Sequence, residues 1–129
     1  MTEEDKRPLL LIVCGGRDFD EAEKMSDAIK RMRPFVIAHG GARGADTLAR
    51  EFATAQRIPQ LRVDAPWDVG GRSSGQRRNR LLLNTALDYA AEFRMRVEML
   101  AAPGGAGTAG MVRFAMAAKV PVLQPWATQ

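Results

Sequence analysis

This sequence of 129 residues contains three glycine-rich stretches whose residue types and spacing suit the binding of a ligand. They cover residues 14–18 (CGGRD), 39–47 (HGGARGADT) and 103–108 (PGGAGT), and each follows an apolar run. Glycines allow a ligand to approach the backbone closely, and the free N–H groups at the start of a helix attract anions. The second and third stretches lead into helical patterns, so this arrangement predicts a site that holds a phosphate.

Hydrophobic periodicity indicates the elements that must position these stretches. Apolar runs predict five strands, at residues 9–13, 35–38, 61–63, 97–102 and 120–123. Amphipathic patterns predict four helices between them, the last three at residues 47–57, 77–93 and 108–118. We expect side-chain N-caps at three of the helices, from Asp20, Asp46 and Thr108.

Strands that alternate with helices predict an α/β fold: a Rossmann-like, doubly wound parallel sheet with helices on both faces. We expect the strand order 3-2-1-4-5, in a single domain over residues 1–129. Such sheets bind ligands beyond the carboxyl ends of the strands, where the strand order reverses. That point lies between the first and fourth strands. The glycine-rich turns follow the first, second and fourth strands, so we expect all three to line one pocket.

The predicted ligand-binding residues come from these turns and from the start of the third predicted crossover helix. They are Gly15, Gly16, Arg17, Gly40, Gly41, Arg43, Gly44, Asp46, Arg78, Asn79, Gly104, Gly105, Gly107 and Thr108. Arg43 lies among glycines at a helix start, so it is the side chain that we expect to hold a phosphate; a solvent-facing arginine is the alternative. Arg78 opposes the dipole of its helix, and a bound anion would offset that unfavourable placement.

Residues 105–110 match the pattern G-x-G-x-x-G after a strand. A dinucleotide site also needs an acidic residue about 20 positions further on, and the sequence ends at Gln129. The motif therefore favours phosphate binding over NAD-dependent hydride transfer, and close packing of helix and strand is its alternative explanation. The sequence contains no Walker A motif and no metal-ligand cluster, so we expect neither a cofactor nor a metal. His39, the only histidine, is more typical of a hydrogen-bonded residue at a strand end than of a catalytic base.

Four motifs, in this order, resemble the SLOG superfamily and within it the YspA-type (cpYpsA-related) group. They are residues 14–19 (CGGRDF), residues 39–46, Arg78-Asn79 and residues 103–108. The superfamily is similar to the Rossmann fold and includes the LOG phosphoribohydrolases, which release cytokinin bases from nucleotides, and the DNA-processing protein A family. The resemblance implies a nucleotide-derived ligand, bound by a sensor or a processing enzyme.

Two positions depart from that pattern. The LOG enzymes carry P-G-G-x-G-T-x-x-E with a catalytic glutamate, and Met111 stands at its position here. Methionine cannot accept a proton, so the resemblance carries over a phosphate site and leaves the catalytic residues unknown. The Gly-Pro-x-Arg-Asn pattern of the group has Gln76 in place of its proline.

Composition limits the possible partners and compartments. No apolar run approaches the ~20 residues of a membrane helix, and the single cysteine cannot form an internal disulfide, so we expect a cytoplasmic protein without membrane contact. The net charge of +4 permits nucleic-acid binding but does not demonstrate it. A homo-oligomer is possible, since related folds often pair through helices.

These observations favour a module that binds a nucleotide-like small molecule without strong catalysis of its own. The first alternative is a nucleotide N-glycosidase or phosphoribohydrolase, whose carboxylate would come from Asp18, Asp46, Asp64 or Asp68. The second is a DNA-binding module of the DNA-processing type, supported by the net charge and by the arginines in residues 72–80.

Overall fold

A five-stranded parallel sheet forms the centre of the molecule in the computed structural model, which describes residues 2–3, 6–64 and 74–126. The strands are β1 (Leu9–Cys14), β2 (Val36–His39), β3 (Gln60–Arg62), β4 (Arg96–Ala101) and β5 (Val122–Leu123). Their order is β3-β2-β1-β4-β5, which confirms the predicted α/β fold and strand order. In the centre of the sheet, Leu10 is in register with Val36 on one side and with Val97 on the other.

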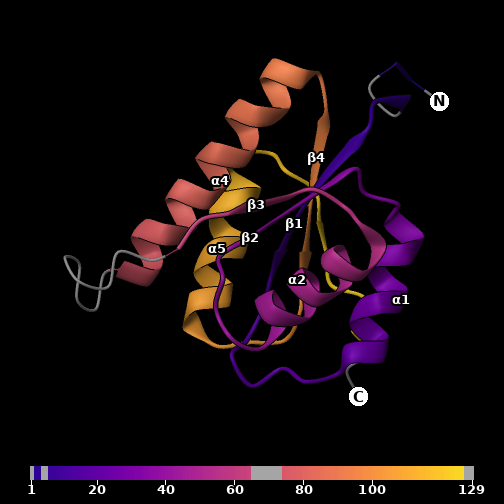
Figure 1. The fold of residues 1–129 in the computed structure, drawn as a ribbon. Helices are drawn as coiled ribbons and strands as arrows, with labels where there is room; N and C mark the ends of the chain where they lie inside the picture. The colour runs from indigo at the N-terminus through magenta and orange to yellow at the C-terminus, as the bar shows by residue number, and fades with distance from the viewer. Residues whose placement is uncertain (1, 4–5, 65–73, 127–129) are drawn as a thin grey trace.

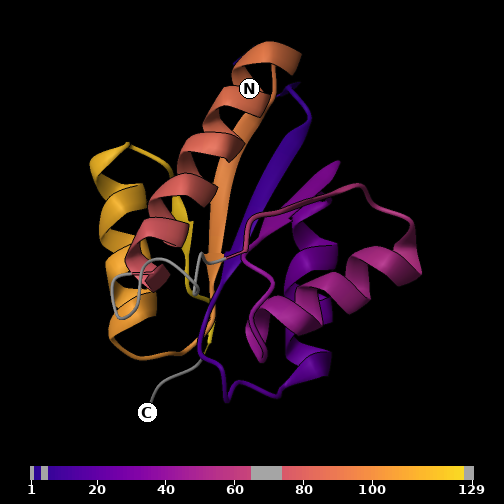
Figure 2. The ribbon, with the colours of Figure 1, turned by 60° about the vertical axis from the view of Figure 1, so that its left-hand side comes forward.

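Helices cover both faces of the sheet, as Figures 1 and 2 show. On one face lie α1 (Ala22–Met32) and α2 (Ala45–Gln56), and on the other lie α4 (Ser74–Phe93) and α5 (Ala106–Ala117). β1 is buried along its whole length, because its alternate side chains enter two separate cores. Leu11 packs with the residues of α1 and α2, and Leu10 packs with those of α4 and α5.

The predicted side-chain caps are wrong, because α1, α2 and α5 have no side-chain hydrogen bond at their N-cap positions. α2 begins at Ala45 rather than after Asp46, and the Ala45 N–H donates to the carbonyl of Gly16 at 3.2 Å. α5 begins at Ala106, so Thr108 lies within its first turn, and α1 has Glu21 rather than Asp20 at its N-cap position. A capping prediction looks for a side-chain oxygen near the helix start and cannot see an acceptor from a distant loop.

The boundaries of two elements differ from the sequence predictions. β2 begins at Val36, which leaves Phe35 exposed ahead of it. α4 begins at Ser74, three residues earlier than predicted, and therefore places Arg78 in its second turn. Residues 65–73, which include Trp67, lie outside the described residues. In the described part of the chain, no helix has both the length and the apolar character needed to cross a membrane.

A basic residue in the left-handed conformation lies just after each of the four described helices. It directly follows α1, α2 and α4, and it comes two residues after the end of α5. The φ angles of these four residues lie between 53° and 62°: Arg33, Arg57, Arg94 and Lys119. Glycine is the usual residue at such a position, since a Cβ strains it. Because crossover helices run antiparallel to the strands, all four residues lie toward the amino ends of the strands. Figure 1 shows the start of β1 and the end of α4 together at this end of the molecule.

Candidate functional site

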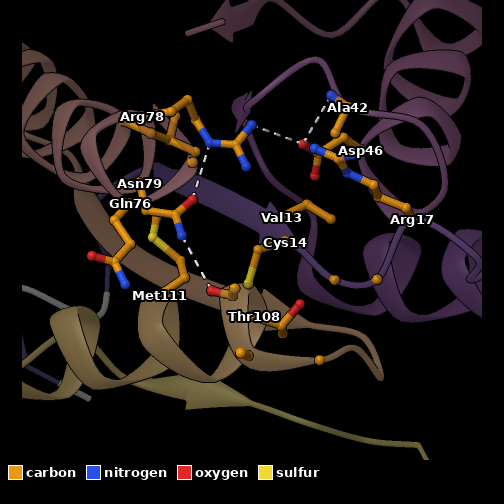
Figure 3. A pocket seen from close by; sticks show the side chains of 17 residues that line it. Val13, Cys14, Arg17, Ala42, Asp46, Gln76, Arg78, Asn79, Thr108 and Met111 are labelled. Carbon is orange, nitrogen blue, oxygen red and sulfur yellow. Dashed lines mark hydrogen bonds and ion pairs between the residues drawn. The ribbon is translucent and has the colours of Figure 1, made fainter. Parts of the chain in front are cut away.

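A cavity of about 380 Å³ opens at the carboxyl ends of the central strands, where the strand order reverses. The loops after β1 and β4 border it, and the first turns of α2, α4 and α5 point toward it (Figure 3). Nine predicted site residues line this cavity: Gly15, Gly16, Arg17, Asp46, Arg78, Asn79, Gly105, Gly107 and Thr108.

The backbone of Gly16 joins the three glycine-rich loops. Its N–H donates to the carbonyl of Pro103 at 2.9 Å, and its own carbonyl accepts from Phe19 and Ala45, each at 3.2 Å. Gly44, at the start of α2, has φ +80°, and a Cβ there would collide with the Gly16 carbonyl. The fold therefore requires glycine at position 44. Gly44 lines neither this cavity nor a second cavity that adjoins it.

Two other glycines are also explained by close packing. A Cβ on Gly15 would lie 2.6 Å from the Cβ of Ala45 and 2.7 Å from that of Ala102. A Cβ on Gly104 would collide with the hydroxyl of Thr108, and Gly104 does not line the cavity. For these positions the alternative explanation from the sequence, close approach of helix and strand, accounts for the glycine.

Gly105 and Gly107 are different, because packing within the fold does not require them to be glycine. Among the described residues, nothing lies within 4 Å of a Cβ built on either one, and neither has a positive φ. Both line the cavity at the start of α5. Glycine at these positions leaves the helix N-terminus open to a molecule in the cavity.

Asp46 is the carboxylate of the described cavity wall, and only 4% of its surface is exposed. Its Oδ2 accepts hydrogen bonds from the N–H groups of Gly40 at 3.1 Å and Ala42 at 3.2 Å. Nη1 of Arg78 lies 3.6 Å from the same oxygen. Burial raises the pKa of Asp46, and the charge of Arg78 and these hydrogen bonds oppose that rise only in part.

Arg78 and Asn79 connect α4 to the loops on both sides of the cavity. Nη1 of Arg78 donates to the Gly40 carbonyl at 2.9 Å, and its Nε donates to Oδ1 of Asn79 at 3.0 Å. The Asn79 amide, 5% exposed, donates in turn to the Gly107 carbonyl at 3.2 Å. Figure 3 shows this chain of contacts running from Asp46 to the start of α5. These two predicted residues therefore border the cavity and also fix its shape.

An apolar floor was not predicted from the sequence. It is formed by Val13, Cys14, Leu82 and Met111, whose side chains reach the cavity from β1, α4 and α5. Met111 is 1% exposed and belongs to the core on this side of the sheet, as its place in the apolar stripe predicts. Burial and the charge of Asp46 raise the pKa of the Cys14 thiol to about 12. That thiol is therefore a small apolar contact and not a nucleophile.

A second cavity, of about 490 Å³, adjoins the first and shares Arg17, Ala42 and Arg78 with it. Its other lining residues are Gly40, Gly41, Arg43, Arg62 and Asp64. Arg43, the predicted phosphate-binding side chain, therefore lies outside the first cavity. Its side chain is 75% exposed and its Nη2 lies 3.5 Å from Oδ1 of Asp18, so it fits the solvent-facing alternative more closely.

His39 is fully buried and has hydrogen-bond partners at both ring nitrogens. The Gly41 N–H donates to Nδ1 at 3.2 Å, so Nε2 carries the proton and donates to Oε1 of Gln60 at 2.8 Å. The ring is thus a structural link between β2 and β3, as its position at a strand end predicts. Within the described ranges, no group of three or more His, Cys, Asp or Glu residues could hold a metal ion.

Of the three predicted hydrolase carboxylates that the structure describes, Asp18, Asp46 and Asp64, only Asp46 lies at the first cavity. Asp64 is at the second cavity and pairs with Arg62, while the side chain of Asp18 is 97% exposed. Asp68 lies outside the described residues. Asp46 is therefore the carboxylate whose position fits cavity chemistry.

The fold and cavity together define a Rossmann-like domain with a ligand-sized hollow at its switch point. Residues 10–70 match the model of the YspA, cpYpsA-related SLOG family, which confirms the predicted resemblance. That range contains the first two motifs, and the motifs at Arg78-Asn79 and residues 103–108 lie beyond it. The chain is also similar to the gene 61 protein of Mycobacterium phage D29. The two are 27% identical over 123 residues, which cover 88% of this chain and 93% of the phage protein.

Proposed function

We propose that this protein binds a nucleotide or nucleotide-derived small molecule in the first cavity, as a sensor or binding module. A phosphate would lie against the backbone of residues 105–108, where the first N–H groups of α5 have no partner within the helix. The observation that supports this proposal best is the open space above Gly105 and Gly107. Two glycines that packing does not require, on the wall of a cavity, are explained by a ligand that approaches the backbone.

The dimensions and lining of the site are compatible with a nucleotide. Its volume of about 380 Å³ falls within the range of roughly 300–1,000 Å³ typical of small-molecule sites. The apolar floor suits a base or a sugar face, and the polar groups of Arg78 and Asn79 suit its hydrophilic edges. The adjoining cavity has room for a further anionic group, and the arginines that line it would attract one.

A thermal-shift screen with AMP, ADP-ribose, NAD and cyclic nucleotides tests this function. A ligand at 100 times its Kd stabilises the folded state by about 2.7 kcal/mol. We expect at least one of these compounds to raise Tm in a concentration-dependent manner. If none does so at millimolar concentration, the proposal is wrong.

Two glycines of α5 provide a matched pair of variants for the responding ligand. Gly107→Ala and Gly110→Ala each raise helix propensity, so both should stabilise the free protein by up to about 1 kcal/mol. A Cβ at either position meets at most an ordinary contact, 3.7 Å from Arg113 at Gly110. Only Gly107 lines the cavity, so we expect Gly107→Ala to weaken binding and Gly110→Ala to leave it unchanged. Equal affinities in both variants would exclude the start of α5 as the binding surface.

A nucleotide N-glycosidase is the second candidate, and the position of Asp46 is the observation in its favour. A buried carboxyl group with a raised pKa, held by two backbone N–H groups at a cavity wall, has the character of a catalytic acid or base. Chromatography of nucleoside monophosphates after incubation with the protein distinguishes the two candidates. Base release that Asp46→Asn abolishes would establish the enzyme, and release no faster than in buffer would leave the binding module.

A further inference from the structure

We propose that the amino-terminal end of the sheet, opposite the cavities described above, binds single-stranded nucleic acid. An open groove of about 590 Å³ lies there, between the chain entering β1, the end of α1 and the start of β4. Five basic residues and one aromatic residue line it: Lys6, Arg7, Arg31, Arg33, Arg96 and Phe35. No function suggested by the sequence motifs involves this surface.

The groove has a strongly positive lining. None of its described lining residues is acidic. Lys6 pairs weakly with Glu3 at 3.8 Å, and Arg96 pairs with Glu98, while Glu4 and Asp5 lie outside the described residues. Arg7, Arg31 and Arg33 are exposed to solvent, so their guanidinium groups can reach phosphates along a strand.

Phe35 gives this surface a second property that a purely electrostatic patch lacks. Its ring is 66% exposed, although its N–H is fixed to the Leu9 carbonyl at 2.8 Å. An exposed aromatic ring on a rigid backbone, surrounded by arginines, is the arrangement on which unpaired bases stack. In a duplex the bases stack on one another, so this arrangement favours a single strand.

Arg33 lines the groove from a strained backbone position. It follows α1 with φ +53° and precedes Pro34, which disfavours continuation of the helix. Glycine would adopt this conformation without a Cβ clash, so the arginine is not what local geometry prefers. Arg57 occupies the equivalent position after α2, at φ +58°, but it does not line the groove. The two residues therefore form a matched pair for a test.

The test measures fluorescence anisotropy of a labelled oligothymidylate and oligouridylate with the full chain at several salt concentrations. If about four phosphates are neutralised, Kd should rise roughly 50-fold between 50 and 200 mM salt. We expect Phe35→Ala to raise Kd about fivefold or more through lost stacking. Arg33→Gly should weaken binding and make it less salt-dependent, with a Tm no lower than that of the parent. Arg57→Gly removes the same charge from the same kind of position and should leave Kd nearly unchanged.

Three kinds of result would overturn the proposal. The first is an equal loss of affinity in Arg33→Gly and Arg57→Gly, because that would reflect net charge alone. The second is tighter binding of a duplex of the same length, or no effect of Phe35→Ala. The third is binding to vesicles that contain phosphatidylserine without binding to either oligonucleotide, which would identify the groove as a membrane contact.

Discussion

The side chain of Asp46 experiences two opposing electrostatic effects. Removal from water disfavours its charged form, whereas Arg78 and two backbone N–H groups favour that form. The desolvation is larger, so the pKa of this carboxyl group is raised despite its partners. A protein gains little stability from such an arrangement, since the attraction within a buried ion pair often does no more than offset the cost of removing both charges from water. The two hydrogen bonds that Asp46 accepts fix the loop after β2, and its place at the cavity wall is compatible with the catalytic role of the second candidate function.

The raised pKa makes a prediction about the pH dependence of stability. Between its ordinary value of 3.8 and its value in the folded protein, the folded state keeps the Asp46 proton and the unfolded state releases it. Raising the pH through this window therefore favours unfolding. We expect the free energy of unfolding of the parent, measured relative to Asp46→Asn, to fall as the pH rises above about 4. Urea unfolding of both proteins from pH 3.5 to 8 measures this difference.

The same titration contains its own control. Asp46→Asn is neutral at position 46 at every pH, so the slope of the difference reports the titration of Asp46 in the parent, with the opposing effects of burial and of Arg78 both included. A difference that rises with pH would mean that Arg78 dominates and that the pKa of Asp46 is lowered.

At the level of the elements, glycines that look alike in sequence have different roles. Gly44 has a positive φ, and a Cβ there would collide with the Gly16 carbonyl, whereas Gly107 has open space around it. We expect Gly44→Ala to destabilise the fold by about 2–4 kcal/mol, from backbone strain and the collision together. Chemical denaturation of Gly44→Ala beside Gly107→Ala checks this contrast. A cost of less than about 1 kcal/mol at position 44 would show that the loops can separate easily.

The sequence was sufficient to predict the order and type of these elements. The continuous apolar run at residues 9–13 identified a strand buried on both faces, and only a parallel sheet between helix layers provides that environment. The residues at which the helices begin were harder to predict from the sequence. Ala45 obtains its acceptor from Gly16, and a contact between distant loops leaves no mark on local periodicity.

The candidate site could be predicted at the level of loops and less well at the level of side chains. Loop convergence follows from topology, because the carboxyl ends of parallel strands meet at one edge of the sheet. Which side chain points inward depends on the local path of each loop. Arg43 turns toward Asp18, and Cys14 and Leu82 enter the cavity although periodicity marks them simply as core. Gln76 also lines the cavity because α4 begins earlier than predicted.

At the scale of the whole molecule, the four basic residues that follow the described helices all lie toward the same end of the sheet. Cations near helix C-termini interact favourably with the helix dipole, but the left-handed backbone strains each of them. Arg57 and Arg94 follow helices on opposite faces of the sheet and do not line the proposed nucleic-acid groove. We expect glycine at each position to stabilise the fold by about 1 kcal/mol, and the two effects to add because the sites share no partner.

Thermal unfolding of Arg57→Gly, Arg94→Gly and the double variant measures these contributions. Lower Tm values in both single variants would show that the dipole interaction outweighs the strain. A double variant that gains clearly less than the sum would indicate that the two helix ends are coupled through the sheet.

The hydrogen bonds of Gly16 also determine when the site can exist during folding. They join a loop near the amino terminus to Pro103, so the cavity depends on contacts between residues far apart in sequence. On the ribosome, the segment around residues 10–70 emerges before α5 and can begin to pair its strands, whereas the wall formed by α5 is added later. A nascent chain should therefore form this domain in stages, and the cavity only after α5 has emerged. A small molecule that binds this cavity would recognise finished molecules and could not assist the early steps of their folding.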